Sequence, residues 1–227
     1  MSTYSDLGIE LMVTGENAGT WGTKTNNNLN LIEQLTGGFA TLSIAGGAGT
    51  QALDIDDGAL TGTAQQKIIE FTGSITGNRV ITIPNDVETF YILKNSTSGA
   101  YTVQFKYATG SGSSTTFSST DKGIKTVYAS ANDGTNPDIV DVMANSSEIV
   151  LANNNPIKFN DADNSAFVGI DAPATVSGSY TLTLPAGVGS ADQALVTTDG
   201  SGTLGFTSTS SFGITTGKAI AMAIVFG

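Results

Sequence analysis

The stretch Tyr101-Thr-Val-Gln-Phe-Lys-Tyr107 carries the clearest strand signal in the chain. Every second residue from Tyr101 to Tyr107 is aromatic or aliphatic, and the residues between them are polar. Successive side chains of a strand point to opposite faces, so this stretch places all its apolar residues on one face. Such alternation is typical of a half-buried strand with one wet face, as in antiparallel sheets.

Similar short runs flank this stretch on both sides, separated by Gly, Asn, Asp and Ser. The predicted strands are Gln51–Ile55, Lys67–Phe71, Arg79–Ile83, Thr89–Lys94, Ala100–Tyr107, Ile124–Ser130 and Asp138–Met143. This number of short strands in residues 38–145 predicts an antiparallel β-sandwich or barrel-like domain. The Gly/Ser-rich segment Gly110–Thr116 is expected to be a flexible surface loop.

Composition excludes several classes of function. The 227 residues include 28 Gly, no Cys and no His, only 13% are charged, and the net charge is −11. Without Cys or His there is no disulfide framework, no zinc site with these ligands and no Ser-His-Asp relay. The acidic balance argues against nucleic acid as a partner. We therefore expect no catalytic residues, no cofactor and no metal.

The ends of the chain contain no secretion or membrane signal. Met1–Asp6 lacks the basic start and apolar centre of a signal peptide. The longest apolar run, Ala219–Phe226, is shorter than the ~20 residues of a membrane helix. We expect a soluble protein that is made in a cytoplasm and is not inserted in a membrane.

Residues 1–37 form the predicted helical segment. Thr23 or Thr25 is expected to cap the helix, and Gly37-Gly38 to end it. The helix carries an apolar stripe, and Trp21, the single Trp, lies near its start. Two interpretations are open: these residues dock onto another protein, or Trp21 packs the helix onto the next domain. The candidate docking residues are Trp21, Leu29, Leu31, Ile32 and Leu35.

Residues 146–212 contain shorter and more widely separated strands. The candidates are Glu148–Leu151, Pro156–Phe159, Ala166–Ile170, Tyr180–Leu184, Ala194–Thr197 and Thr203–Thr207. Pro185 ends the fourth of these, and Asp199–Gly202 is a turn signal. Because large apolar residues are few here, this part cannot build a core of its own. It is expected to be completed by other copies of the chain.

Four sequence strings resemble phage proteins. "YTLTLP" (180–185) and "QALVTTDGSGTLGF" (193–206) resemble a module of bacteriophage tail fibres. "GENAGTWGTKTNNNLNLIE" (15–33) and "GKAIAMAIVFG" (217–227) resemble the beginning and end of fibre-like virion proteins of marine phages. The resemblance implies an elongated, mainly β, homotrimeric tail-fibre or tail-associated subunit that acts in assembly and host attachment. It also implies location in the virion, other virion proteins as partners, and a host-surface glycan or receptor as a ligand.

Two other functions are compatible with the sequence. A capsid decoration or head-fibre protein would have the same chemistry with a different docking site. A polysaccharide-degrading tail enzyme is less favoured, because no carboxylate pair is marked by spacing. The oxygen-rich clusters Asp54–Gly58 and Asn160–Asn164 are interpreted as turns, since neither has the spacing of a calcium loop.

The chain also contains an internal similarity. Residues 74–105 align without gaps with residues 175–206, pairing Pro84 with Pro185 and Phe105 with Phe206. Both segments predict a strand that ends at proline, then a second strand, a glycine turn and a third strand. We expect a shared local structure.

The last residues, 213–227, form an apolar C-terminal segment. An exposed run of this kind invites aggregation, so it is expected to be buried within or between chains. The candidate oligomer-interface residues are Leu182, Leu184, Leu204, Phe206, Ile220, Met222, Ile224 and Phe226.

Overall fold

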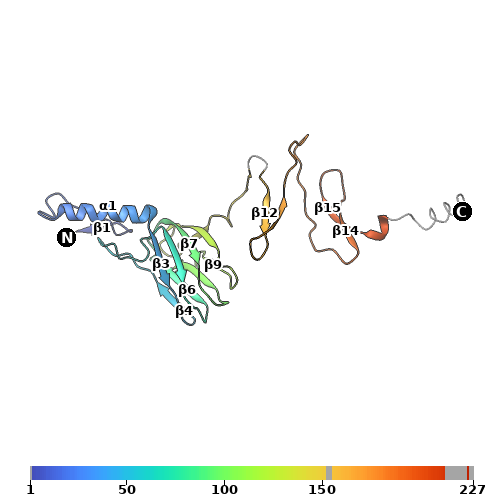
Figure 1. The fold of residues 1–227 in the computed structure, drawn as a ribbon. Helices are drawn as coiled ribbons and strands as arrows, with labels where there is room; N and C mark the ends of the chain where they lie inside the picture. Colours follow the sequence, from blue (N-terminus) through green and yellow to red (C-terminus); the bar gives the residue numbers. More distant parts are fainter. Residues whose placement is uncertain (1, 152–154, 213–223, 225–227) are drawn as a thin grey trace. The chain divides into compact units, whose positions relative to one another are not determined.

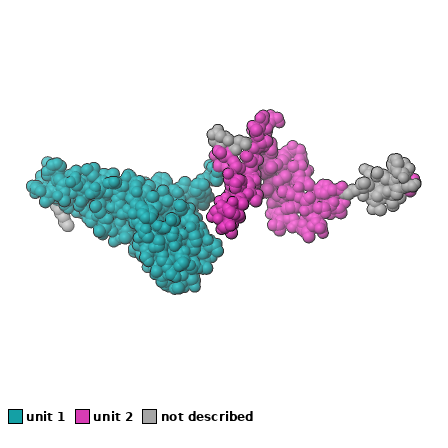
Figure 2. Space-filling view, in the orientation of Figure 1, with its two compact units in different colours: residues 1–149 teal, residues 150–227 magenta. Residues whose placement is uncertain are grey.

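The computed structural model describes residues 2–151, 155–212 and 224 of the chain. It divides into two compact units, Met1–Ile149 and Val150–Gly227 (Figure 2). The described residues are mainly β, with one α-helix and several sheets, none of which closes into a barrel (Figure 1). The mainly β prediction is therefore confirmed.

The first unit begins with a small hairpin and the helix. Strands β1 (Thr3–Tyr4) and β2 (Glu10–Leu11) pair antiparallel, and helix α1 spans Trp21–Gly37. Neither Thr23 nor Thr25 caps the helix, which corrects the prediction. A turn in which the Thr20 N–H donates to the Asn17 carbonyl reverses the chain earlier, so both threonines fall inside the helix. The helix ends as predicted, and the Gly38 N–H donates to the Gln34 carbonyl at 2.8 Å.

Two sheets form the body of this unit. Their strands are β3 (Phe39–Ser43), β4 (Gly49–Ala52), β5 (Ile68–Thr72), β6 (Arg79–Ile83), β7 (Thr89–Asn95), β8 (Val103–Tyr107), β9 (Thr115–Phe117), β10 (Ile124–Ala129) and β11 (Ile139–Asp141). The five-stranded sheet has the order β11-β10-β7-β5-β3, and the four-stranded sheet has the order β4-β6-β8-β9. From β3 to β8, successive strands therefore alternate between the two sheets.

This alternation makes the central strands parallel. Strands β3, β5 and β7 pair in parallel, as do β4, β6 and β8, whereas the pairs β7–β10, β10–β11 and β8–β9 are antiparallel. The antiparallel prediction is thus wrong for the centre of both sheets. The chain crosses to the other sheet after each strand, so it returns to the first sheet in the same direction. Period-two alternation reports which face is buried and carries no information on strand direction.

The chain therefore winds as a coil with two strands per turn. Between the sheets, consecutive turns of the coil touch at their corners through the parallel bridges Gly46↔Ile75 and Ser74↔Ser98. Gly99 lies at such a corner with φ +101°, and a Cβ there would lie 2.2 Å from the Ile75 carbonyl oxygen. A residue with a side chain does not fit at this position.

Both sheets contribute to one hydrophobic core. The rings of Tyr91 and Phe105 meet edge-on with centroids 5.5 Å apart, and the Tyr91 hydroxyl donates to the Ala64 carbonyl at 2.8 Å. Val103, Phe105 and Tyr107 are fully buried, as the opening alternation predicts. Tyr101 precedes β8 and is 38% exposed, so the buried stretch is shorter than the sequence pattern.

The segment predicted as a loop, Gly110–Thr116, contains no strand up to residue 114, but its last two residues belong to strand β9. Thr115 and Phe117 are buried, and the Thr115 hydroxyl donates to Asp141 Oδ2 at 3.2 Å. The prediction failed at Thr115 and Thr116 because they continue a run of Gly, Ser and Thr that has the composition of a loop. The same reason applies to β3, where Gly, Ala, Thr and Ser surround two large apolar residues, Phe39 and Leu42.

The second unit contains two separate hairpins. Strand β12 (Ile157–Asn160) pairs antiparallel with β13 (Phe167–Ile170), and β14 (Gln193–Thr197) pairs antiparallel with β15 (Leu204–Ser208). A short 3₁₀-helix at Thr209–Phe212 follows. Glu148–Leu151 forms no strand, and Tyr180–Leu184 contributes one parallel bridge, Thr183↔Thr203. Apart from this bridge, residues 180–184 pair with no strand among the described residues.

The internal similarity is matched in part. In the first unit, β6 and β8 are parallel neighbours, and the aligned Thr183 and Thr203 likewise form a parallel bridge. The middle strands differ, because β7 belongs to the other sheet whereas β14 pairs with β15. The two segments therefore have one feature in common, the parallel pairing of their first and third strands.

Candidate functional site

The outer side of α1 carries an exposed apolar strip. Trp21, Leu29 and Ile32 are 64%, 58% and 45% exposed. At about 100° per residue these three positions fall within roughly 80° of one another around the helix. Three of the five predicted docking residues are therefore accessible to a partner.

Leu31 has a different position. It is fully buried, and Leu35 is half-buried, so neither offers the surface that the exposed strip does. The polar residues beside Leu31 attach the same side of the helix to the first unit. Asn27 Nδ2 donates to the Gly58 carbonyl at 3.4 Å, and Gln34 Nε2 donates to the Leu60 carbonyl at 3.3 Å.

Glu10 and Asn28 join the hairpin to the helix. The Asn28 side chain pairs with both backbone groups of Glu10, accepting from its N–H at 3.0 Å and donating to its carbonyl at 2.8 Å. The almost fully buried Glu10 carboxylate accepts from Ser2 and Asn17 and lies 3.0 Å from Lys24 Nζ. These hydrogen bonds, that from Ser2 most of all, lower the pKa of Glu10 to about 2. At neutral pH the Glu10 carboxylate is ionised, and its bonds hold the helix that carries the exposed strip against the hairpin.

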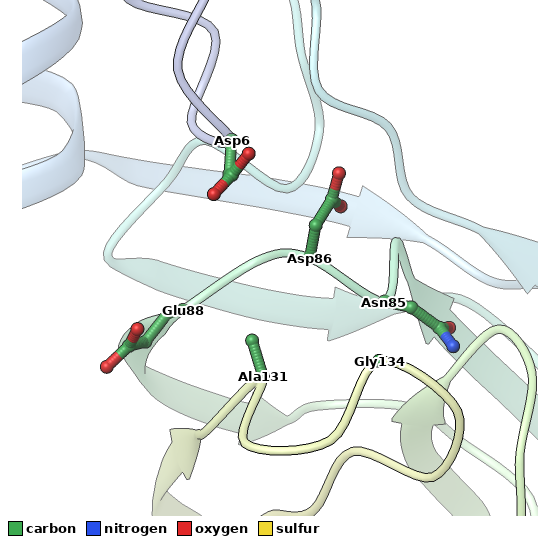
Figure 3. Close-up of a pocket in the computed structure, with 6 residues that line it drawn as sticks. All are labelled: Asp6, Asn85, Asp86, Glu88, Ala131 and Gly134. Atoms are coloured by element: carbon green, nitrogen blue, oxygen red, sulfur yellow. The ribbon is translucent and has the colours of Figure 1, made fainter.

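Carboxylates gather around an open hollow at one end of the first unit. Figure 3 shows Asp6 from the turn between β1 and β2, and Asn85, Asp86 and Glu88 from the connection between β6 and β7. The hollow has a volume of about 420 Å³. Glu88 points away from Asp6 and Asp86 in Figure 3 and accepts a hydrogen bond from the Tyr128 hydroxyl. A surface of this charge disfavours phosphate and other anionic ligands.

The two oxygen-rich clusters have turn geometry. Thr63 donates to Asp54 through its N–H and its hydroxyl, and these bonds lower the pKa of Asp54. The Ser165 N–H donates to Asp161 and Asp163 at 2.9 and 3.0 Å. No group of three or more His, Cys, Asp or Glu that could hold a metal ion occurs among the described residues.

In the second unit, the β12–β13 hairpin has one fully apolar face. The register pairs Ile157 with Ile170 and Phe159 with Val168, so these four side chains lie on one side. They are 51%, 65%, 59% and 72% exposed in that order. The other side carries Lys158 and Phe167, with Lys158 Nζ 4.3 Å from the Phe167 ring centre. The alternation in residues 157–160 was available in the sequence, but these residues were not among the predicted interface residues.

The apolar face continues beyond the hairpin. Ile157, Ile170, Val176, Tyr180 and Leu182 line a hollow of about 500 Å³, so the structure brings predicted interface residue Leu182 next to this face. Leu184 is 72% exposed. The five side chains that line the hollow form an apolar surface, and each of them is at least 46% exposed.

The second hairpin is similarly exposed. Leu195 and Phe206 face each other across β14 and β15 and are 50% and 39% exposed, and Leu204 is half-buried. Ile224 is 77% exposed. The other predicted interface residues, Ile220, Met222 and Phe226, lie outside the described residues.

Comparison with known proteins yields no similarity: no family model, no curated protein and no solved structure matches the chain. Among the described residues, no helix has the length and apolar character needed to span a membrane.

Proposed function

We propose that this protein is a structural subunit of a phage virion, a tail fibre or tail-associated fibre protein that acts in assembly and host attachment and forms a homotrimer. The four sequence strings that resemble fibre proteins support the biological setting. The observation that supports assembly is the lack of a core in the second unit, where no described residue is buried.

The energetics favour completion of the second unit by other copies. A single two-stranded hairpin is at best marginally stable in water, and β12–β13 exposes four large apolar side chains on one face. Full burial stabilises by roughly 1.5–3 kcal/mol per side chain, so covering this face gains up to about 6–12 kcal/mol per copy. That is comparable to the ~5–15 kcal/mol stability of a whole domain. Threefold symmetry closes the assembly and matches the fibres that the sequence resembles.

The test of assembly is the mass of the purified full chain. Sedimentation equilibrium at micromolar concentration should give three times the 23.1 kDa chain mass. Phe159→Asp places a charge on the apolar face and should abolish the trimer. Asn160→Asp adds the same charge on the opposite face of the hairpin and should leave the trimer intact. A monomeric wild-type protein would refute the proposal.

The exposed strip of α1 is the proposed anchor on the virion. Because Asn28 and Leu31 attach the helix to the first unit, point variants test docking better than removal of residues 1–37. Trp21→Ser and Ile32→Ser change exposed side chains and should leave the far-ultraviolet circular dichroism unchanged, yet the variant protein should be missing from assembled particles. Asn30→Ala is the matched exposed control. Normal incorporation of Trp21→Ser would contradict docking through this strip.

The position on the particle and the absence of turnover are separate parts of the proposal. Imaging of particles with a label on this protein distinguishes a tail location from a capsid decoration or head-fibre location. An assay for release of reducing sugar from host polysaccharide tests the less favoured enzyme. Turnover that depends on Asp86 or Glu88 in the acidic hollow would overturn the structural role.

A further inference from the structure

Two neighbouring rows on the outer face of the five-stranded sheet are almost entirely apolar. Its register aligns Phe39, Ile68, Ile92 and Thr126 in one row, and Phe90, Tyr128 and Val140 in the next. The third row is mostly polar and holds Thr41, Glu70, Lys94 and Ile124. Ile124 is 65% exposed, while Phe39 and Phe90 are 57% and 47% exposed. All these side chains point away from the core, because their neighbours along each strand, such as Phe71 and Tyr91, are the buried ones.

The outer face of the other sheet is polar in composition, although Thr82 on it is buried. It carries Thr50, Gln104 and Thr116 in one row and Thr82 and Lys106 in the next, with Val80 as its one large apolar residue. A sheet with one face on the core is expected to have a polar outer face, and this sheet conforms. The five-stranded sheet departs from that pattern in its two apolar rows. An exposed group of apolar side chains of this kind is typical of an interaction surface.

Charge on the apolar face favours contact with an identical chain. The protein has 20 acidic and nine basic residues, so most of its surfaces would repel each other. On this face, however, Lys94 lies 2.8 Å from Glu70, Lys67 lies over the Phe90 ring, and Glu88 accepts from Tyr128. Two positive and two negative charges balance, and each has a partner before any docking occurs. The face can therefore lie against another copy of the chain without adding net repulsion.

Area also favours a copy over a different partner. Five strands ~4.8 Å apart and five residues long at ~3.3 Å span roughly 400 Å², about half of what one partner of a standard interface buries. A protein that bound here alone would bind weakly. A second copy of this chain would add the apolar faces of its second unit to the same association.

We propose that the outer face of the five-stranded sheet is a self-association surface, so that the first unit is part of the oligomer interface together with the second. This inference rests on the proposed homo-oligomer and names the face that it uses. The sheet edge at β3, where Phe39 lies, and the centre at Ile92 are both part of this surface.

Thiol reactivity in the full chain tests this proposal cleanly because the protein has no cysteine. Ile124→Cys places a thiol on the apolar face, and Thr116→Cys places one on the polar face of the other sheet. Both positions are exposed in one chain. In the wild-type-like oligomer we expect a bulky water-soluble maleimide to react at least tenfold more slowly at position 124 than at position 116. On dilution to single chains, the two rates should become similar.

The mass of the same preparations separates this inference from the proposed function. An oligomer in which both thiols react equally fast would overturn the self-association surface and leave the assembly through the second unit standing. A monomeric wild-type chain would overturn both. Slow reaction at position 124 that occurs only in assembled particles would assign the face to another virion protein and also overturn the proposal.

Discussion

At the scale of single residues, the Glu10 carboxylate has the most consequential environment. Its pKa is lowered from 4.5 to about 2, so its charge stabilises the folded hairpin and helix above pH 4.5. This contribution is lost as the pH falls through about 2. We predict that hydrogen exchange of the amides in β1, β2 and α1 accelerates between pH 4.5 and 2 relative to exchange in β5–β8, after correction for intrinsic rates.

Glu10→Gln should weaken this protection at pH 7 and remove most of its pH dependence, because the amide cannot carry the charge that Lys24 pairs with. Glu33→Gln, which changes an exposed residue of the same helix, is the control. Equal pH profiles for the wild type and Glu10→Gln would show that another group controls the hairpin.

Residue-level prediction from the sequence had a clear limit in α1. The apolar positions were identified correctly as a set, but the stripe did not show that Leu31 is buried while Leu29 and Ile32 are exposed. That difference depends on which side of the helix the Glu10 hairpin and the 58–60 loop cover. Such contacts between residues 18 to 31 positions apart are not encoded in helical periodicity.

At the scale of elements, the glycine corners of the coil allow a graded prediction. Gly99 combines φ +101° with a backbone oxygen 2.2 Å from the position that a Cβ would occupy, Gly46 has φ +116° but open space, and Gly47 has neither restriction. We predict that Gly47→Ala is nearly neutral and that Gly46→Ala costs ~1–3 kcal/mol of unfolding free energy from backbone strain. Gly99→Ala should cost more than Gly46→Ala, because its methyl group also displaces the Ile75 carbonyl.

Chemical denaturation of the three variants measures this order. If Gly99→Ala and Gly47→Ala have the same midpoint, the corner at Ile75 is not required for the stacking of the coil.

Most elements were predictable from local pattern, and their arrangement was not. Arg79–Ile83 matches β6 at both ends, and Thr89–Lys94 falls one residue short of β7. Parallel pairing could not be predicted, because it follows from the alternation of strands between two sheets, a tertiary property. The exposed face of the five-stranded sheet was missed because an apolar face seen in a sequence is normally assigned to the core. For β12, completion by other copies was expected, but Ile157 and Phe159 were not named as interface residues.

At the scale of the whole molecule, the two units differ in what stabilises them. The first has a buried core that both its sheets share, and in the second no described residue is buried. If copies of the chain supply the missing contacts, the stability of the second unit depends on protein concentration, whereas the core of the first unit persists without partners. Dissociation is therefore expected to unfold the hairpins before the coil.

Hydrogen exchange measured over a dilution series tests this order. We predict that amide protection in β12–β15 falls at least tenfold when the chain is diluted below the concentration at which the oligomer dissociates, and that protection in β5–β8 changes little over the same range. Phe159→Asp, which should not form the trimer, is expected to show the low protection of β12–β15 at every concentration, because each copy then offers a charge where an apolar contact is needed. If protection in β12–β15 is the same in the dissociated and associated chain, the hairpins are stable alone and their apolar faces serve a partner other than this chain.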